Sequence, residues 1–157
     1  MADLFDSEII SLFKSLNEQA VKYILVGGLA VNYHGFIRST GDVDVWIDDS
    51  KTNRNNFVNA LKNYGIEGAE IFYKLPFMAG CTEITLDNGV YIDLMSDLQF
   101  FKKENFEECY HLAPEFNIFE NIIVKVLHIN TLIAEKEKSN RPKDNLDAQE
   151  LKKLYQL

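Results

Sequence analysis

The sequence contains few cysteines and no long apolar run. Two cysteines, Cys81 and Cys109, are too few for a disulfide framework. The acidic start, residues 1–6, lacks the basic region of a secretory signal. The longest apolar stretch, residues 23–31, falls well short of the roughly 18 residues that a membrane span needs. These absences predict a cytoplasmic protein that does not cross a membrane.

Basic residues are also scarce. Sixteen Lys and Arg stand against 24 Asp and Glu, which gives a formal net charge of −8. This balance disfavours unspecific binding to nucleic acid or to anionic membranes, because both carry negative charge. A polyanionic ligand therefore requires a local basic cluster. The only candidate is the segment 136–153, which includes Lys136, Arg141 and Lys143.

Prolines are few and scattered, and no linker-like or repetitive tract interrupts the chain. A length of 157 residues with 46% hydrophobic residues fits one domain, residues 1–157, with its own core. Local patterns predict an α/β fold. Strands are expected over 22–26, 43–47, 81–86, 90–95 and 122–129, and helices over 7–20, 29–34, 52–64, 130–138 and after Pro142, with Ser7 and Asn130 as helix caps; residues 66–80 and 96–121 show no clear pattern.

Two acids on one predicted strand carry the clearest chemical signal. Asp42 and Asp44 are two residues apart, so their carboxylates point to the same face of the strand. Carboxylates this close raise each other's pKa unless a cation lies between them, and a hard divalent ion is the natural partner. The pair predicts a Mg²⁺ site.

A third acid, Asp93, lies between apolar neighbours on a later strand, where an unpaired carboxylate would be costly. The segments 81–86 and 90–95 flank a turn-forming Asp87-Asn88-Gly89 and are expected to pair antiparallel. If the Asp93 strand lies beside the Asp42 strand, the three acids could hold two metal ions about 4 Å apart, an arrangement used for displacement at phosphorus.

Gly27 and Gly28 separate a predicted strand from a short helix, where the lack of side chains would let the backbone approach a phosphate. The chain has neither the glycine-lysine loop of P-loop proteins nor the three-glycine dinucleotide fingerprint. The glycine turn alone is compatible with an ordinary turn, and the Asp pair alone with a solvated strand end.

In combination, these residues resemble the nucleotidyltransferase superfamily related to DNA polymerase beta. The likeness covers Val26-Gly27-Gly28, then Arg38-Ser39-Thr40-Gly41-Asp42-Val43-Asp44, and later Ile92-Asp93-Leu94. The Arg-x-Thr-x-Asp-x-Asp form is most similar to small bacterial members, namely lincosamide-type antibiotic nucleotidyltransferases and nucleotidyltransferase toxins of abortive-infection systems. Gly28 departs from the serine that is common in many members.

The C-terminal segment also resembles these relatives, through Lys136, then Arg141-Pro142-Lys143-Asp144 and Asp147. The resemblance implies the minimal nucleotidyltransferase fold, a mixed β-sheet with helices packed mainly on one face. It implies Asp42, Asp44 and Asp93 as catalytic and metal-holding residues for one or two Mg²⁺ ions. The implied nucleotide-binding residues are Gly27, Gly28, Arg38, Thr40, Lys136, Arg141 and Lys143.

Structural roles remain open for the basic residues. Arg38 could instead pair with Asp42 or Asp44, and Lys136, Arg141 and Lys143 could only complement a helix end and nearby acids. His34 is more typical of a helix cap or a packed side chain than of a substrate ligand.

The implied activity is transfer of a nucleoside monophosphate from a nucleoside triphosphate to an acceptor hydroxyl, on a small molecule, a tRNA or a protein, with release of pyrophosphate. One alternative is a catalytically silent module that binds nucleotide or a partner protein, as in a toxin–antitoxin pair. Another is an unrelated α/β protein whose acids are structural. The sequence leaves the acceptor undetermined, and a homodimer or a partner protein could complete the acceptor site.

Overall fold

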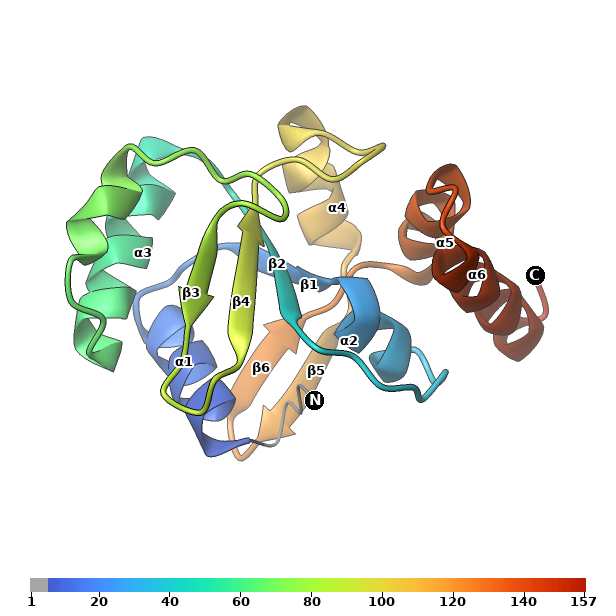
Figure 1. Ribbon diagram of the computed structural model, residues 1–157, viewed down its shortest axis with the longest axis horizontal. Coiled ribbons are helices and arrows are strands. Elements are labelled where there is room, and N and C mark those ends of the chain that lie inside the picture. The colour runs from blue at the N-terminus through green and yellow to red at the C-terminus, as the bar shows by residue number, and fades with distance from the viewer. Residues whose placement is uncertain (1–5) are drawn as a thin grey trace.

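The computed structural model describes residues 6–157, and a four-stranded mixed β-sheet forms its centre (Figure 1). The strands are β1 (Tyr23–Val26), β2 (Val43–Ile47), β3 (Glu83–Thr85) and β4 (Tyr91–Met95), in the spatial order β1-β2-β4-β3. Strands β2 and β4 are parallel, whereas the edge strands β1 and β3 run antiparallel to their neighbours. The predicted α/β class is therefore confirmed.

Six α-helices surround the strands of the described chain. They are α1 (Ser7–Glu18), α2 (Gly27–Tyr33), α3 (Lys51–Tyr64), α4 (Phe106–Leu112), α5 (Ile129–Lys138) and α6 (Pro142–Tyr155). Short 3₁₀ turns cover Ala69–Tyr73 and Lys103–Asn105. Helices α5 and α6 form a hairpin near α2 (Figure 1). Within residues 6–157, none of these helices combines the length and apolar character that a bilayer crossing requires.

The two faces of the sheet are covered differently. One face of the sheet carries Tyr23, Leu25 and Val45 and is fully buried. On this face, Tyr23 stacks on Phe13 of α1. The opposite face carries Asp44 and Trp46 on β2, because alternate residues of a strand point to opposite sides. Phe106 of α4 packs edge-on against Trp46. Helix α4 thus covers only one end of this second face, and the end with Asp44 is left half-buried.

Helix ends differ from the sequence prediction by one or two residues. The cap of α1 is Asp6, whose carboxylate accepts from the Glu8 N–H at 2.9 Å, and Ser7 lies inside the helix. The cap of α5 is His128 and not Asn130. Both corrections have one cause: a side-chain acceptor was available just upstream of the expected cap. Gly65 ends α3 with a left-handed φ of 113°, one residue after the predicted helix 52–64.

The chain after residue 96 departs most from expectation. Helix α4 and strand β5 (Glu115–Phe119) were not predicted, whereas β6 (Ile122–Lys125) lies within a predicted strand and pairs with β5 as a hairpin. The strand expected over 122–129 ends at Lys125, because the chain then leaves the hairpin and continues beside β1. There Val126 bridges Leu25 in parallel, and the Leu127 N–H donates to the Leu25 carbonyl at 3.0 Å. This change of partner brings α5 toward α2.

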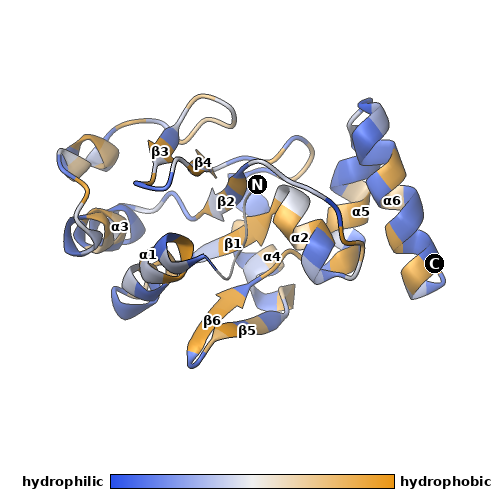
Figure 2. Cartoon of the chain, turned by 60° about the horizontal axis from the view of Figure 1, so that its bottom comes forward, coloured by the Kyte–Doolittle hydropathy of each residue, from blue (hydrophilic) through white to orange (hydrophobic). Residues whose placement is uncertain are grey.

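The strand predicted over 81–86 is shorter than expected, at Glu83–Thr85, and it does pair antiparallel with β4. The hydropathy of the elements agrees with their places: the strands are largely hydrophobic, whereas α6 is mostly hydrophilic (Figure 2). Helix α6 nevertheless buries two acids, Asp144 and Asp147, on the side that faces the rest of the molecule.

Candidate active site

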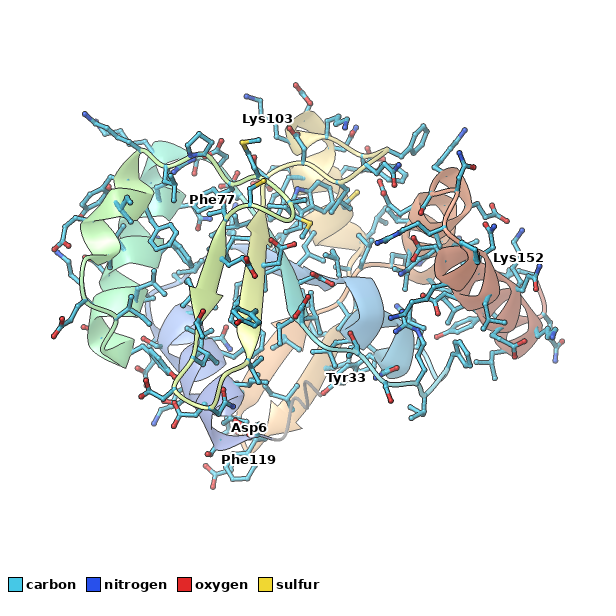
Figure 3. The ribbon with its side chains drawn as sticks, in the orientation of Figure 1. Asp6, Tyr33, Phe77, Lys103, Phe119 and Lys152 are labelled. Carbon is cyan, nitrogen blue, oxygen red and sulfur yellow. The ribbon has the colours of Figure 1, made fainter. Side chains whose placement is uncertain are left out.

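The open end of the sheet faces the α5–α6 hairpin across a cleft of about 870 Å³. A volume of this size is typical of small-molecule and cofactor sites. Phe77, labelled in Figure 3 on the loop before β3, is one of its lining residues. The structure brings every predicted site residue to this one cleft: Gly27, Gly28, Arg38, Thr40, Asp42, Asp44, Asp93, Lys136, Arg141 and Lys143.

The glycine turn packs directly against the acidic strand. Gly27 has a φ of 66°, and a Cβ placed on it would lie 2.0 Å from Oδ2 of Asp44. A Cβ on Gly28 would lie 2.4 Å from Oγ1 of Thr40. Any side chain at either position would displace the residue opposite. The glycines therefore allow the start of α2 to approach the carboxylate of Asp44, and Thr40 packs against the same turn.

Asp44 and Asp93 are partners on adjacent strands. They occupy the same register position of the parallel pair β2 and β4, so both side chains leave the sheet on the same face. Each oxygen of the Asp93 carboxylate accepts from the Gly80 N–H at 3.0 Å, which holds the side chain in place. The adjacency on which a shared acidic site depends is therefore present. Asp42 lies just before β2, exposed, at the edge of the same cleft.

Burial and mutual repulsion alter the acidity of this group. Burial, followed by the charges of Asp93 and Asp42, raises the pKa of Asp44 from 3.8 to about 6, although Lys136 and Arg141 act in the opposite sense. Burial also raises the pKa of Asp93, against the effect of the hydrogen bond from Gly80. The positive charges of Lys136 and Arg141 therefore offset only part of the cost of ionising Asp44.

The donor atoms suit a hard cation. Across residues 6–157, no three Asp, Glu, His or Cys side chains already lie close enough together to hold a metal ion. Mg²⁺ does not require such a cage, since it keeps several waters and commonly binds one or two carboxylates together with substrate phosphates. Asp44 and Asp93 offer two carboxylates whose raised pKa values a cation would lower. The residues present therefore fit Mg²⁺.

The opposite wall of the cleft holds a chain of ion pairs. Arg38 binds Asp147 through two hydrogen bonds, of 2.6 and 2.7 Å. Lys136 lies between two acids of α6, at 2.8 Å from Asp144 and 3.0 Å from Asp147. Arg141 binds Asp144 at 2.6 Å. The salt bridge considered for Arg38 thus exists, but its partner is Asp147 and not Asp42 or Asp44.

These pairs leave some of the basic residues accessible. The side chain of Arg141 is 76% exposed despite its bond to Asp144. Lys143 is exposed and makes no side-chain ion pair or hydrogen bond with the part of the chain that is described. Although burial acts to raise it, hydrogen bonds from Lys136, Ser139 and Arg141 lower the pKa of Asp144 to about 2. Arg141 and Lys143 are therefore the most available cations for an anionic ligand.

Sequence reasoning missed Glu135 and Gly80 as parts of the cleft. The Glu135 carboxylate accepts from the backbone N–H groups of residues 99, 100 and 101, at 3.2, 2.7 and 2.6 Å, and so holds that loop against α5. No local sequence pattern predicts such contacts between distant segments. Asp144 and Asp147, three residues apart on a helix, share one face, and that spacing was a usable signal.

His34 has a structural role. Its Nε2 donates to the Leu127 carbonyl at 2.7 Å, because a carbonyl can only accept, and Nδ1 therefore accepts from the Tyr155 hydroxyl at 2.9 Å. Burial lowers the pKa of His34 and so favours this neutral form. The ring ties the end of α2 to α6 and contributes nothing to the cleft lining.

In comparisons with known proteins, the chain matches no family model, and no curated protein aligns with it significantly.

Proposed function

We propose that this chain is a cytoplasmic, Mg²⁺-dependent nucleotidyltransferase of the minimal nucleotidyltransferase fold. It would transfer a nucleoside monophosphate from a nucleoside triphosphate to an acceptor hydroxyl and release pyrophosphate. The single observation that carries this proposal is the pairing of Asp44 with Asp93 on adjacent strands, with Asp44 packed on the Gly27 turn in one cleft. The acceptor is a hydroxyl on a small molecule, a tRNA or a protein.

Under this proposal Asp44 and Asp93 would hold the metal, and Asp42, exposed at the edge of the cleft, is the further candidate ligand. When bound, Mg²⁺ would neutralise charge on the triphosphate and orient it. Asp93 would accept the proton of the attacking hydroxyl as the new O–P bond forms and the bond to pyrophosphate breaks. Asp93 stands on β4, apart from Asp42 and Asp44, which supports a role distinct from theirs.

The triphosphate would lie between the glycine turn and the basic wall. Gly27 and Gly28 both line the cleft; Gly27 is half-buried, and Gly28 is buried where Thr40 and Arg38 pack against the turn. Arg141 and Lys143 supply exposed positive charge from the far side of the cleft. Charge-assisted contacts of this kind position phosphates and offset their negative charge.

One observation favours the silent-module alternative. Arg38, Lys136 and Arg141 already bind Asp144 or Asp147, so a triphosphate must share these cations with carboxylates of the chain itself. A module that only binds nucleotide or a partner protein would tolerate such sharing, whereas catalysis requires strong neutralisation of the developing charge.

Isothermal titration with each of the four ribonucleoside triphosphates, with and without Mg²⁺, tests the binding step. We expect binding that depends on Mg²⁺, that Asp44→Asn abolishes, and that Asp87→Asn leaves intact. Asp87 is the matched control because it is an exposed carboxylate in the β3–β4 turn, outside the cleft lining. Absence of Mg²⁺-dependent binding of all four nucleotides would contradict the proposal.

Pyrophosphate release in the presence of hydroxyl-bearing acceptors separates the two functions. Small molecules, tRNA and the chain itself would be offered in turn. Release that is lost in Asp93→Asn supports transfer. Nucleotide binding without release from any acceptor class supports the silent module.

A further inference from the structure

Asp147 is a buried carboxylate at the back of the basic wall. Its exposed fraction is 0%, and both oxygens are occupied. Oδ1 accepts from Nε of Arg38 at 2.6 Å, and Oδ2 accepts from a terminal nitrogen of the same guanidinium at 2.7 Å and from Nζ of Lys136 at 3.0 Å. Arg38 and Asp147 are 109 residues apart in sequence. Asp147 therefore joins the loop before β2 to α5 and α6.

The geometry of this pair determines which edge of Arg38 faces the cleft. A guanidinium is a rigid plane with five N–H groups, and the fork formed with Asp147 uses the edge that contains Nε. The remaining terminal nitrogen, Nη1, donates to the Ser39 carbonyl at 2.9 Å. That same nitrogen lies 3.2 Å from the position that a Cβ on Gly28 would occupy. The edge of Arg38 not bound to Asp147 thus lies at the glycine turn.

We propose that Asp147 is a positioning residue for a polyphosphate ligand. It holds the guanidinium of Arg38 so that the spare N–H groups of that side chain point to the Gly28 turn, where they bind phosphate oxygens. Asp147 itself touches no ligand, since its carboxylate is fully buried behind Arg38 and Lys136. The inference rests on the proposed function only in taking a polyphosphate as the ligand.

Positioning and simple charge balance predict opposite signs for one substitution. Asp147→Asn removes a negative charge from the basic wall. If Asp147 served only to neutralise charge, an anion would bind more tightly to the variant, because the wall becomes more positive. If Asp147 positions Arg38, the anion binds more weakly, because the fork that orients the guanidinium is lost.

The test measures the dissociation constant of tripolyphosphate by isothermal titration, at low salt and without Mg²⁺. We expect Asp147→Asn and Arg38→Lys each to weaken binding by about tenfold or more, since a lysine keeps the charge but cannot form the fork. The double variant should bind no more weakly than either single variant, because both changes remove the same interaction.

Glu137→Gln is the matched control. Glu137 on α5 pairs with Lys152 on α6, which is labelled in Figure 3, and neither residue lines the cleft. This substitution removes an ion pair between the same two helices without touching the basic wall. The tripolyphosphate dissociation constant should stay within about twofold of the original value, since distant sites act independently.

Circular dichroism and thermal melting show whether each variant is folded at the titration temperature. Should Asp147→Asn fail to fold, Arg38→Lys decides by itself, and unchanged affinity in that variant overturns the inference. Equal or tighter binding by folded Asp147→Asn overturns it as well, as does a lack of tripolyphosphate binding by the original chain. Weakened tripolyphosphate binding together with no nucleotide transfer would keep the inference and refute the transferase proposal.

Discussion

Replacing Asp44 by Asn should stabilise this chain at neutral pH. The pKa of Asp44 is raised from 3.8 to about 6 because the carboxylate is buried near Asp93 and Asp42. One pKa unit corresponds to about 1.4 kcal/mol, so the ionised Asp44 destabilises the folded state by about 3 kcal/mol. An amide of similar shape never ionises and avoids this cost. A residue that the proposed activity needs is therefore expected to lower stability.

The effect depends on pH in a defined direction. Well below pH 3.8 the Asp44 carboxyl is protonated in both the folded and the unfolded chain, and the cost is absent. As the pH rises past 3.8 toward about 6, the unfolded chain loses this proton more readily than the folded chain does, so stability falls. The full cost is present at pH 7 and above. The difference between Asp44→Asn and the original chain should therefore appear between pH 4 and pH 7.

Urea unfolding at pH 4 and at pH 7.5, with EDTA present, measures this difference. At pH 7.5 the variant should gain up to about 3 kcal/mol in unfolding free energy, or roughly 6–12 °C in Tm for a chain of this size. At pH 4 the gain should fall to about 0.5 kcal/mol, because the folded Asp44 is then protonated. Asp87→Asn provides a control, since Asp87 is an exposed carboxylate in the β3–β4 turn, outside the cleft lining.

Addition of MgCl₂ extends the same experiment. A cation that binds the folded state at Asp44 and Asp93 should stabilise the original chain and have less effect on Asp44→Asn, by mass action. The reasoning is refuted if the two chains show the same pH dependence, or if the variant is less stable at pH 7.5. Either result would mean that Asp44 is solvated and is not confined among other acids.

Three further predictions concern the same cleft. In urea titrations, Gly27→Ala should lower the unfolding free energy more than Gly68→Ala does. Both glycines have φ near 70°, where a side chain costs about 1–2 kcal/mol, but only the new side chain at position 27 would also clash with Asp44. Equal losses would show that the turn and the acid are not in contact. Asp93→Asn should abolish pyrophosphate release while calorimetry shows only a modest loss of Mg²⁺–nucleotide affinity, and near-normal release would assign the proton to another group. Lys143→Ala should weaken tripolyphosphate binding at low salt but have little effect in about 0.5 M NaCl, where charges are screened beyond about 3–5 Å. A loss of affinity that persists at high salt would argue against an exposed, screened contact.

Several features of this protein follow from its sequence alone. The positions of Asp42 and Asp44 relative to Gly27 and Gly28 were enough to predict a strand, a turn and a short helix before an acidic strand. The structure begins that strand at Val43, so that Asp44 lies on it and Asp42 just before it. These are local properties of the backbone, which depend on neighbours within a few residues. The order of the first strands and helices was therefore predicted well, apart from their caps.

Only the tertiary structure decided which distant segments meet. The parallel pairing that aligns Asp44 with Asp93 joins strands almost fifty residues apart, and no local pattern encodes it. The same holds for Arg38 and Asp147, which the sequence identified separately as a candidate ligand and as part of a C-terminal pattern. Strand pairing and buried ion pairs form between segments that pack together on folding. The sequence therefore determined the chemical groups of the cleft, and the fold determined which of them face one another.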